Sequence, residues 1–292
     1  MERILLIETS TALCSAALAE DGAITAYKES SAPKAHASLT GVFIQEMLAE
    51  RGLTLADCDA ICVSMGPGSY TGLRVGVSTA KGLCFGAGKP LLAVGTLDTL
   101  VAQAMEEIPG QAGNDGQTGT PGNGNLGNGI HGSVNAIPDN SNGTPGNGIT
   151  GTANVIPDLI GDPRFIIPMI DARRMEVYTA VFTSTPSVIP SEAEGSLRYV
   201  QISETAPVII DENSFAEYLE QGPVLFIGDG AGKCADVIRH PNAHFCQCHP
   251  KASSMLAPAI VQLRAGNFQD VAYFEPFYLK EFVATVSKKK LW

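Results

Sequence analysis

Short apolar runs separated by polar turns open the chain and predict a small antiparallel sheet. Residues 3–7 and 13–19 are apolar, and the turn between them is rich in Thr and Ser, so the two runs predict a β-hairpin. Residues 27–29 add a third strand after an Asp-Gly turn. From 37 to 51 the apolar residues recur at helical spacing instead, which predicts an amphipathic helix.

A buried strand at 61–64 is followed directly by a glycine-rich turn and a second helix. Apolar residues recur at helical spacing over 71–85, until two glycines end the helix. A strand at 91–94 and a helix at 98–107 follow. Strand, glycine turn and helix in this order present backbone N–H groups that suit an anion. The glycine spacing, however, matches neither a Walker loop nor a dinucleotide-binding loop.

The helix at 71–85 carries small residues at every fourth position, Gly72, Gly76 and Ala80. One face is therefore almost bare of side chains, although each interior glycine costs about 1 kcal/mol of helix propensity. Such a face allows another backbone, often that of a second helix, to approach closely. The spacing predicts a tight contact here and leaves open whether it is internal or made with a partner.

The C-terminal part repeats the plan of the N-terminal part. Apolar runs at 165–170 and 175–182 flank a polar turn, which again predicts two antiparallel strands. A strand at 224–227 is followed by a glycine-rich turn and a helix, as at 61–85. Two halves of one plan predict duplicated α/β lobes.

Between the halves the composition changes abruptly. Thirteen of the 31 glycines lie between Gly110 and Gly151, and the sequence GTPGNG at 119–124 recurs at 143–148. So polar a segment buries too little apolar surface to offset the entropy of ordering it. We predict an N-terminal lobe at 1–106, a flexible low-complexity insertion at 107–163 and a C-terminal lobe at 164–292.

Composition and charge limit the function further. With 45% apolar and 17% charged residues the chain can bury a sizeable core, and its net charge of −11 argues against direct grip on a nucleic-acid backbone. Seven cysteines without framework spacing are typical of a reducing compartment. The chain shows neither a signal peptide nor an apolar run long enough to span a membrane. These features predict a cytoplasmic protein with no membrane partner.

The glycine turn and its helix carry the most specific motif, GPGSYTGLR at 66–74. Further matches follow in the same order: IETST at 7–11, HASL at 36–39, GTLD at 95–98, IDAR at 170–173 and EPFYL at 275–279. This set resembles the TsaB (YeaZ) family, the non-catalytic partner of TsaD in making threonylcarbamoyladenosine on tRNA. The resemblance covers the chain to about residue 105 and again from about 165.

The resemblance implies an α/β fold of two ribonuclease-H-like lobes, as in the actin, sugar-kinase and Hsp70 superfamily. It implies a scaffold and activator that binds a TsaD-like protein, with a TsaE-like ATPase in the larger complex. It further implies a homodimer through the same helices, tRNA contact only through the partner, and no cofactor.

By this resemblance the helices at 37–51 and 71–85 meet the equivalent helices of the partner. The residues predicted for the interface are His36, Leu39, Phe43, Met47, Gly72, Leu73, Gly76, Val77 and Ala80. Periodicity alone does not decide which of them face the partner and which face this protein's own sheet.

Two turns occupy the places where kinases of the superfamily hold phosphates. Thr9 and Ser10 lie in the first, and Gly228 and Gly230 in the second. These four residues are our candidates for vestigial nucleotide loops, although Glu8 stands where the family typically has Asp. An ATP-dependent small-molecule kinase is therefore the alternative function.

Catalytic motifs are otherwise missing from the sequence. Thr96 and Leu100 stand where TsaD-like enzymes carry a His-x-x-x-His metal pair, which argues against metal-dependent carbamoyl transfer. No nucleophile elbow or His-Glu-x-x-His motif supports a peptidase. Asp171 and Glu176 lie at a turn that also fits a non-catalytic role. The residues His244, Cys246, Cys248 and His249 are of metal-ligand type, but their spacing is typical of a strand rather than a zinc site.

Overall fold

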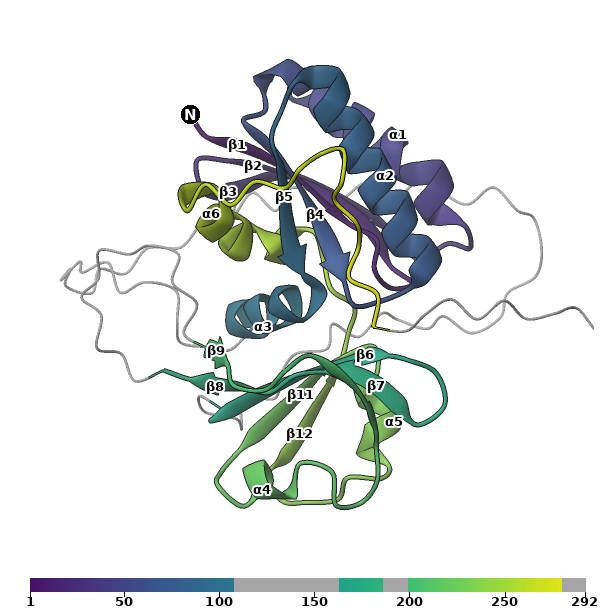
Figure 1. Ribbon diagram of the computed structural model, residues 1–292, viewed down its shortest axis with the longest axis vertical. Coiled ribbons are helices and arrows are strands. Elements are labelled where there is room, and N and C mark those ends of the chain that lie inside the picture. Colours follow the sequence, from purple (N-terminus) through teal and green to yellow (C-terminus); the bar gives the residue numbers. More distant parts are fainter. Residues whose placement is uncertain (108–162, 186–198, 280–292) are drawn as a thin grey trace, which may run out of the picture. The chain divides into compact units, whose positions relative to one another are not determined.

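The computed structural model describes residues 1–107, 163–185 and 199–279 (Figure 1). These residues form two mixed β-sheets with helices packed on their faces. The predicted insertion at 107–163 lies outside the described residues apart from its two end residues.

The first sheet has five strands in the order β3-β2-β1-β4-β5. They are β1 (Arg3–Glu8), β2 (Cys14–Glu20), β3 (Ala23–Ser30), β4 (Ala60–Gly66) and β5 (Leu91–Gly95). β1, β2 and β3 are antiparallel neighbours, and β4 and β5 continue the sheet parallel to β1. This confirms the predicted hairpin, and it is the arrangement of a ribonuclease-H-like α/β fold.

Helices cover both faces of this sheet because side chains alternate along its strands. Leu5 and Ile7 point to α1 (Ala35–Glu50) and α2 (Tyr70–Ala87), which share one buried apolar cluster with them. Ile4 points to the opposite face, where the apolar side of α6 (Leu256–Arg264) covers it. Figure 1 shows α1 and α2 on one side of the sheet and α6 on the other. A short 3-10 turn, η2 (Ser253–Met255), leads into α6, and another, η1 (Leu55–Asp57), precedes β4.

The second sheet repeats the order and the strand directions of the first. Its strands are β6 (Phe165–Asp171), β7 (Glu176–Thr179), β8 (Phe182–Ser184), β9 (Tyr199–Gln201), β10 (Ala206–Ile209), β11 (Val224–Gly228) and β12 (Ala243–Gln247). The path β10-β7-β6-β11-β12 is antiparallel on the β10 side of β6 and parallel on the β12 side. The strand predicted at 175–182 is split into β7 and β8, because β7 also pairs with β10 whereas β8 pairs with β9.

The helix that follows β5 packs on the second sheet rather than on the first. Leu97, Leu100 and Val101 of α3 (Thr96–Glu107) share a buried cluster with Ile166 and Leu225. The opposite face is covered by residues of two short helices and their flanks, α4 (Ala216–Leu219) and α5 (Ala231–Ala235). Thus α3 lies in the predicted N-terminal lobe but packs on the second sheet, and α6 lies in the predicted C-terminal lobe but packs on the first. The division at 106 and 164 stays a prediction. None of the helices in the described ranges is long and apolar enough to cross a membrane.

Candidate functional site

The turn that follows β1 forms a joint between this strand and the two long helices α1 and α2. Glu8, Thr9 and Ser10 are wholly buried. The Thr9 hydroxyl donates a hydrogen bond to the carbonyl oxygen of Gly72 in α2 (2.9 Å), and the backbone N–H of Ser69 donates one to the carbonyl oxygen of Ser10 (2.6 Å). These contacts fix the start of α2 against the end of β1.

On the α1 side, His36 lies at the start of the helix. Its Nε2 donates a hydrogen bond to the carbonyl oxygen of Thr11 (2.8 Å). The turn thus joins β1 to both long helices, and His36 has an internal role that the sequence did not predict.

The bare face of α2 points at this joint, which corrects the predicted interface. A Cβ on Gly72 would collide with the backbone oxygen of Thr9, and one on Gly76 would collide with the Thr9 hydroxyl. Gly68 meets Ser10 in the same way. The close approach that the glycine spacing predicts is therefore made with β1 of the same chain, and a large side chain at Gly76 has no room within the fold.

Most of the other predicted interface residues also face inward. Phe43, Met47, Leu73, Val77 and Ala80 are all at most 4% exposed. Four of them, all but Leu73, belong to the buried cluster that contains Leu5 and Ile7, so these side chains lie in this chain's own core. Of the nine predicted residues, His36 and Leu39 alone are half-buried, and both lie on α1.

The outer side of α1 and α2, which faces away from the sheet, is formed by residues other than the predicted nine. A Cβ on Gly41, Gly82 or Gly86 would meet nothing within 4 Å. Phe85 is 87% exposed and Val42 40% exposed. The signal for this face was present in the sequence, because Gly82 and Gly86 are also four residues apart.

Glu8 is a buried carboxyl that forms no ion pair with any residue the structure describes. Its Oε1 accepts hydrogen bonds from the backbone N–H of Ser10 (2.6 Å) and from the Ser64 hydroxyl (3.0 Å). Its Oε2 has no partner among the described residues. Burial raises the pKa of Glu8 to about 7, and the hydrogen bonds from Ser10 and Ser64 oppose that shift. A carboxyl enclosed in this way reaches no ligand in solvent.

The corresponding turn of the second sheet is open. Asp171 and Arg173 are exposed, and the Asp171 carboxylate pairs with Lys233. Gly228 and Gly230 both lie against β6, where a Cβ would press on the carbonyl oxygen of Met169. The predicted nucleotide-loop residues Thr9, Ser10, Gly228 and Gly230 therefore all have packing roles inside the chain.

The two turns border one open hollow of about 1030 Å³. Ala12 and Ser69 line it from the first half, and Asp171, Arg173 and Asp229 from the second. Burial raises the pKa of Asp229, and its Oδ2 lies 3.9 Å from Nδ1 of His249. The hollow thus carries charges of both signs and no dominant one.

The residues that were considered as metal ligands in the sequence, and the two that replace the histidine pair, are apart or buried. Thr96 and Leu100 are fully buried in α3. Cys246 is buried in β12, Cys248 is half-buried, and His244 is half-buried on the same strand. Within 1–107, 163–185 and 199–279, no three His, Cys, Asp or Glu side chains come together in a metal-binding arrangement.

Comparison with known proteins finds relatives for part of this chain. A model of the TsaD family, described as tRNA N6-adenosine threonylcarbamoyltransferase, matches residues 29–114. The tRNA threonylcarbamoyladenosine biosynthesis protein TsaB of Escherichia coli (strain K12) is 40% identical over 105 residues, which are 36% of this chain and 45% of that protein. TsaB of Haemophilus influenzae is 42% identical over 105 residues, 36% of this chain and 44% of that protein. The match spans less than half the length of each relative.

The fold extends the likeness to the rest of the chain. The solved structure of YeaZ from Pseudomonas aeruginosa superposes with a TM-score of 0.67 at 21% identity, covering 96% of this chain and 100% of that one. At this identity the likeness shows a shared fold. The TsaB matches at about 40% identity, together with this shared fold, support the identification of the chain with the TsaB (YeaZ) family.

Proposed function

We propose that the chain is a scaffold and activator subunit in the synthesis of threonylcarbamoyladenosine on tRNA. It acts by holding a TsaD-type threonylcarbamoyltransferase against the outer face of α1 and α2. The chain itself carries no catalytic site, and tRNA meets it only through the partner.

The observation that carries this proposal is the outer face of the two helices. Gly41 on α1 and Gly82 and Gly86 on α2 leave room for another helix to lie close. Phe85, at 87% exposure, is the size of side chain that anchors an interface when a partner pocket encloses it. The inner faces of α1 and α2 already pack on the sheet, so the outer face is not needed for this chain's own core.

The segment shared with the transferase family supports the choice of partner. The TsaD family model matches 29–114, a range that includes both helices. Two related proteins that carry the same helix pair can join through it about a pseudo-two-fold axis, as identical subunits do about a true one. The same geometry allows two copies of this chain to pair when the partner is absent, and leaves the remaining surface for a TsaE-like ATPase.

The absence of a catalytic role is supported by the enclosed turn after β1. Glu8, Thr9 and Ser10 have no exposed surface, and their polar groups serve the contact with α2. Thr96 and Leu100 cannot replace a pair of metal-binding histidines, because the leucine side chain has no ligand atom.

Binding to the purified transferase partner tests the proposal directly. Phe85→Glu and Gly82→Leu should each weaken binding at least about tenfold, since a charge or a bulky side chain at a close helix contact costs more than about 1.4 kcal/mol. The threonylcarbamoyladenosine content of tRNA should fall with it in cells that depend on the variant.

Ile209→Glu is the matched control, because Ile209 is a large apolar residue, 75% exposed, on β10 of the second sheet. It should bind the partner as the unchanged chain does. Normal binding by both Phe85→Glu and Gly82→Leu would refute the helix-face proposal.

The alternative, an ATP-dependent small-molecule kinase, is favoured by one observation, the hollow of about 1030 Å³ between the two turns. It requires ATP turnover by the chain alone. Steady hydrolysis that is lost in Asp171→Ala would establish the kinase and overturn the scaffold.

A further inference from the structure

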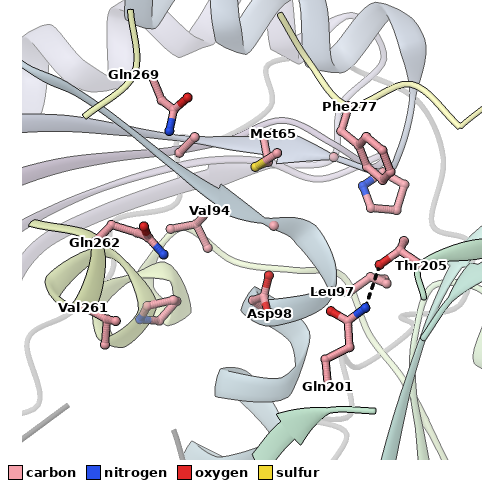
Figure 2. A pocket seen from close by; sticks show the side chains of 15 residues that line it. Met65, Val94, Leu97, Asp98, Gln201, Thr205, Val261, Gln262, Gln269 and Phe277 are labelled. Atoms are coloured by element: carbon pink, nitrogen blue, oxygen red, sulfur yellow. Dashed lines mark hydrogen bonds between the residues drawn. The ribbon is translucent and has the colours of Figure 1, made fainter. Parts of the chain in front are cut away.

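A cavity of about 400 Å³ lies beside the free edge of β5, away from the outer face of α1 and α2 (Figure 2). The C-terminal segment pairs with β5 at Leu91, where the backbone N–H of Gln269 donates to its carbonyl oxygen (2.8 Å). It returns at Phe277, whose N–H donates to the carbonyl oxygen of Met65 (2.7 Å). Between these two attachments the cavity stays open to ligands.

The walls are mainly apolar, and one carboxylate points into them. Apolar side chains come from β4, β5, α3, α6 and the C-terminal segment: Met65, Val94, Leu97, Pro258, Val261 and Phe277. Figure 2 shows the Asp98 carboxylate directed into the space between Val94 and Thr205. Asp98 lies in the first turn of α3, and Gly95 makes room for it, because a Cβ there would collide with Asp98 Oδ2.

No described cation neutralises this carboxylate. Among the residues of the three described ranges, no Lys, Arg or His nitrogen lies within 4.0 Å of Asp98. Burial is the main influence on it and raises its pKa, opposed only by its own backbone N–H. A half-buried carboxylate of this kind gains from a cation brought by a ligand.

The neighbouring polar groups also present acceptors. The side-chain amide N–H groups of Gln201 donate hydrogen bonds to the carbonyl oxygen of Ser203 (2.6 Å) and to the Thr205 hydroxyl (3.2 Å). The side-chain carbonyl oxygen of Gln201 therefore lies on the side of Asp98 (Figure 2). The carbonyl oxygen of Gly66 lies 3.9 Å from the point where a Gly95 Cβ would stand. An acceptor-rich, apolar-walled space favours a ligand with several N–H donors on an apolar body.

We propose that this cavity binds an organic cation, a primary ammonium or guanidinium group on an apolar chain or ring, with Asp98 as its counter-ion. The cation has two sources with the same chemistry, a free small amine or a Lys side chain of a docked protein. The free-amine source is independent of the scaffold function proposed above, whereas the protein source rests on it.

Titration of the full chain with benzylamine tests the proposal, with benzyl alcohol as the neutral probe of the same shape. Backbone N–H signals of Gly95, Asp98 and Gln201 in a ¹⁵N-labelled sample should shift and saturate at roughly millimolar benzylamine, the affinity expected of so small a ligand. Benzyl alcohol should bind at least about tenfold more weakly, since it lacks the charge that Asp98 recognises.

Asp98→Asn should weaken benzylamine binding about tenfold or more, and Asp236→Asn, an exposed carboxylate on α5's C-terminal end, should leave it unchanged. Gln201→Ala removes one acceptor without touching α3, and should weaken binding about threefold even if Asp98→Asn does not fold. Equal binding of the amine and the alcohol, or benzylamine affinity unchanged in both Asp98→Asn and Gln201→Ala, would overturn the proposal.

A carbodiimide then distinguishes the two sources. Applied to the chain together with its purified transferase partner, it joins a carboxylate to a contacting amine without a spacer. A cross-link between Asp98 and a partner lysine assigns the cation to the partner. Benzylamine binding without that cross-link assigns it to a free amine.

Discussion

The two sheets share one strand order but carry very different helices. On the first sheet α1 and α2 have 16 and 18 residues, whereas α4 and α5, near the second sheet, have 4 and 5. One face of the second sheet is still covered by those short helices, while α3, of 12 residues, covers the other. A face of this sheet plan therefore does not require long helices, and the extra length of α1 and α2 leaves an outer face that this chain's own core does not use.

The turn after β1 and the turn after β6 also differ, in burial and in backbone conformation. The turn after β1 is enclosed, and none of the described residues 8–13 has a positive φ. The turn after β6 is exposed, and Arg173 and Arg174 have φ values of 70° and 52°. The turn after β1 is tightly packed and its backbone is unstrained. The turn after β6 is loosely packed and contains two residues with strained backbone. Substitutions that add volume should therefore damage the first half, and substitutions that relax the backbone should help only the second.

The largest effect is expected for Gly72→Ala. In an open helix this change would stabilise by up to about 1 kcal/mol. Here the new Cβ meets the backbone oxygen of Thr9, which cannot move without displacing β1. We expect the free energy of unfolding to fall by about 3 kcal/mol or more, measured by urea denaturation.

Gly232→Ala is the matched change in α5. Its Cβ would meet the far end of the Gln247 side chain, 2.7 Å away, and that side chain can move aside only by weakening its hydrogen bonds with Gly232 and Asp229. The cost should be about 1–2 kcal/mol, smaller than for Gly72→Ala, because no backbone has to move. Equal losses in the two variants would show that the first joint is no tighter than its counterpart.

The next effect concerns Glu8 and should depend on pH. The folded chain raises the pKa of Glu8 from its ordinary 4.5 to about 7, so between these values the unfolded chain ionises while the folded one keeps its proton. The free energy of unfolding therefore falls as pH rises from 4.5 to about 7 and then levels off. At about 1.4 kcal/mol per pKa unit the loss is roughly 3 kcal/mol.

Glu8→Gln removes this ionisation and keeps an oxygen for the Ser10 and Ser64 donors. At pH 9 the variant should be more stable than the unchanged chain by about 3 kcal/mol, and at pH 4 by less than about 1 kcal/mol. Asp171→Asn, in the exposed turn, should change stability by less than about 1 kcal/mol. A difference between Glu8→Gln and the unchanged chain that does not vary with pH would contradict the enclosed carboxyl.

Much of the fold was predictable from local patterns. The hairpin at the start, the two long helices and the glycine turn all follow from the period of apolar residues and from glycine positions, and the structure confirms them. The short elements β9, β10 and α4 have three or four residues each, too few for a period to show. That α6 covers the first sheet could not be predicted, because only tertiary packing decides which sheet a helix joins.

The site shows the limit of the same patterns more sharply. The spacing of Gly72 and Gly76 correctly indicates a close contact but does not name the other side of it, and the resemblance assigned it to a partner. The other side of the contact is Thr9 of the same chain. Because Thr9 is far from Gly72 in the sequence, the local pattern does not reveal this contact. Asp98 was missed as well, since its surroundings come from segments as distant as Gln201 and Phe277.

The smallest effect separates the two turns by backbone strain. Arg173 has a φ of 70°, a region that costs a residue with a Cβ about 1 kcal/mol or more and costs glycine nothing. Arg173→Gly should therefore raise the free energy of unfolding by up to about 1 kcal/mol, after the extra entropy of glycine in the unfolded chain is subtracted.

Ala12→Gly is the counterpart in the turn after β1, at an exposed residue with ordinary φ. It relieves no strain, so it should lower the free energy of unfolding by about 0.5–1 kcal/mol. Paired urea denaturation curves measure both variants against the unchanged chain. If the two substitutions moved stability in the same direction, backbone strain would not be what distinguishes the open turn from the enclosed one.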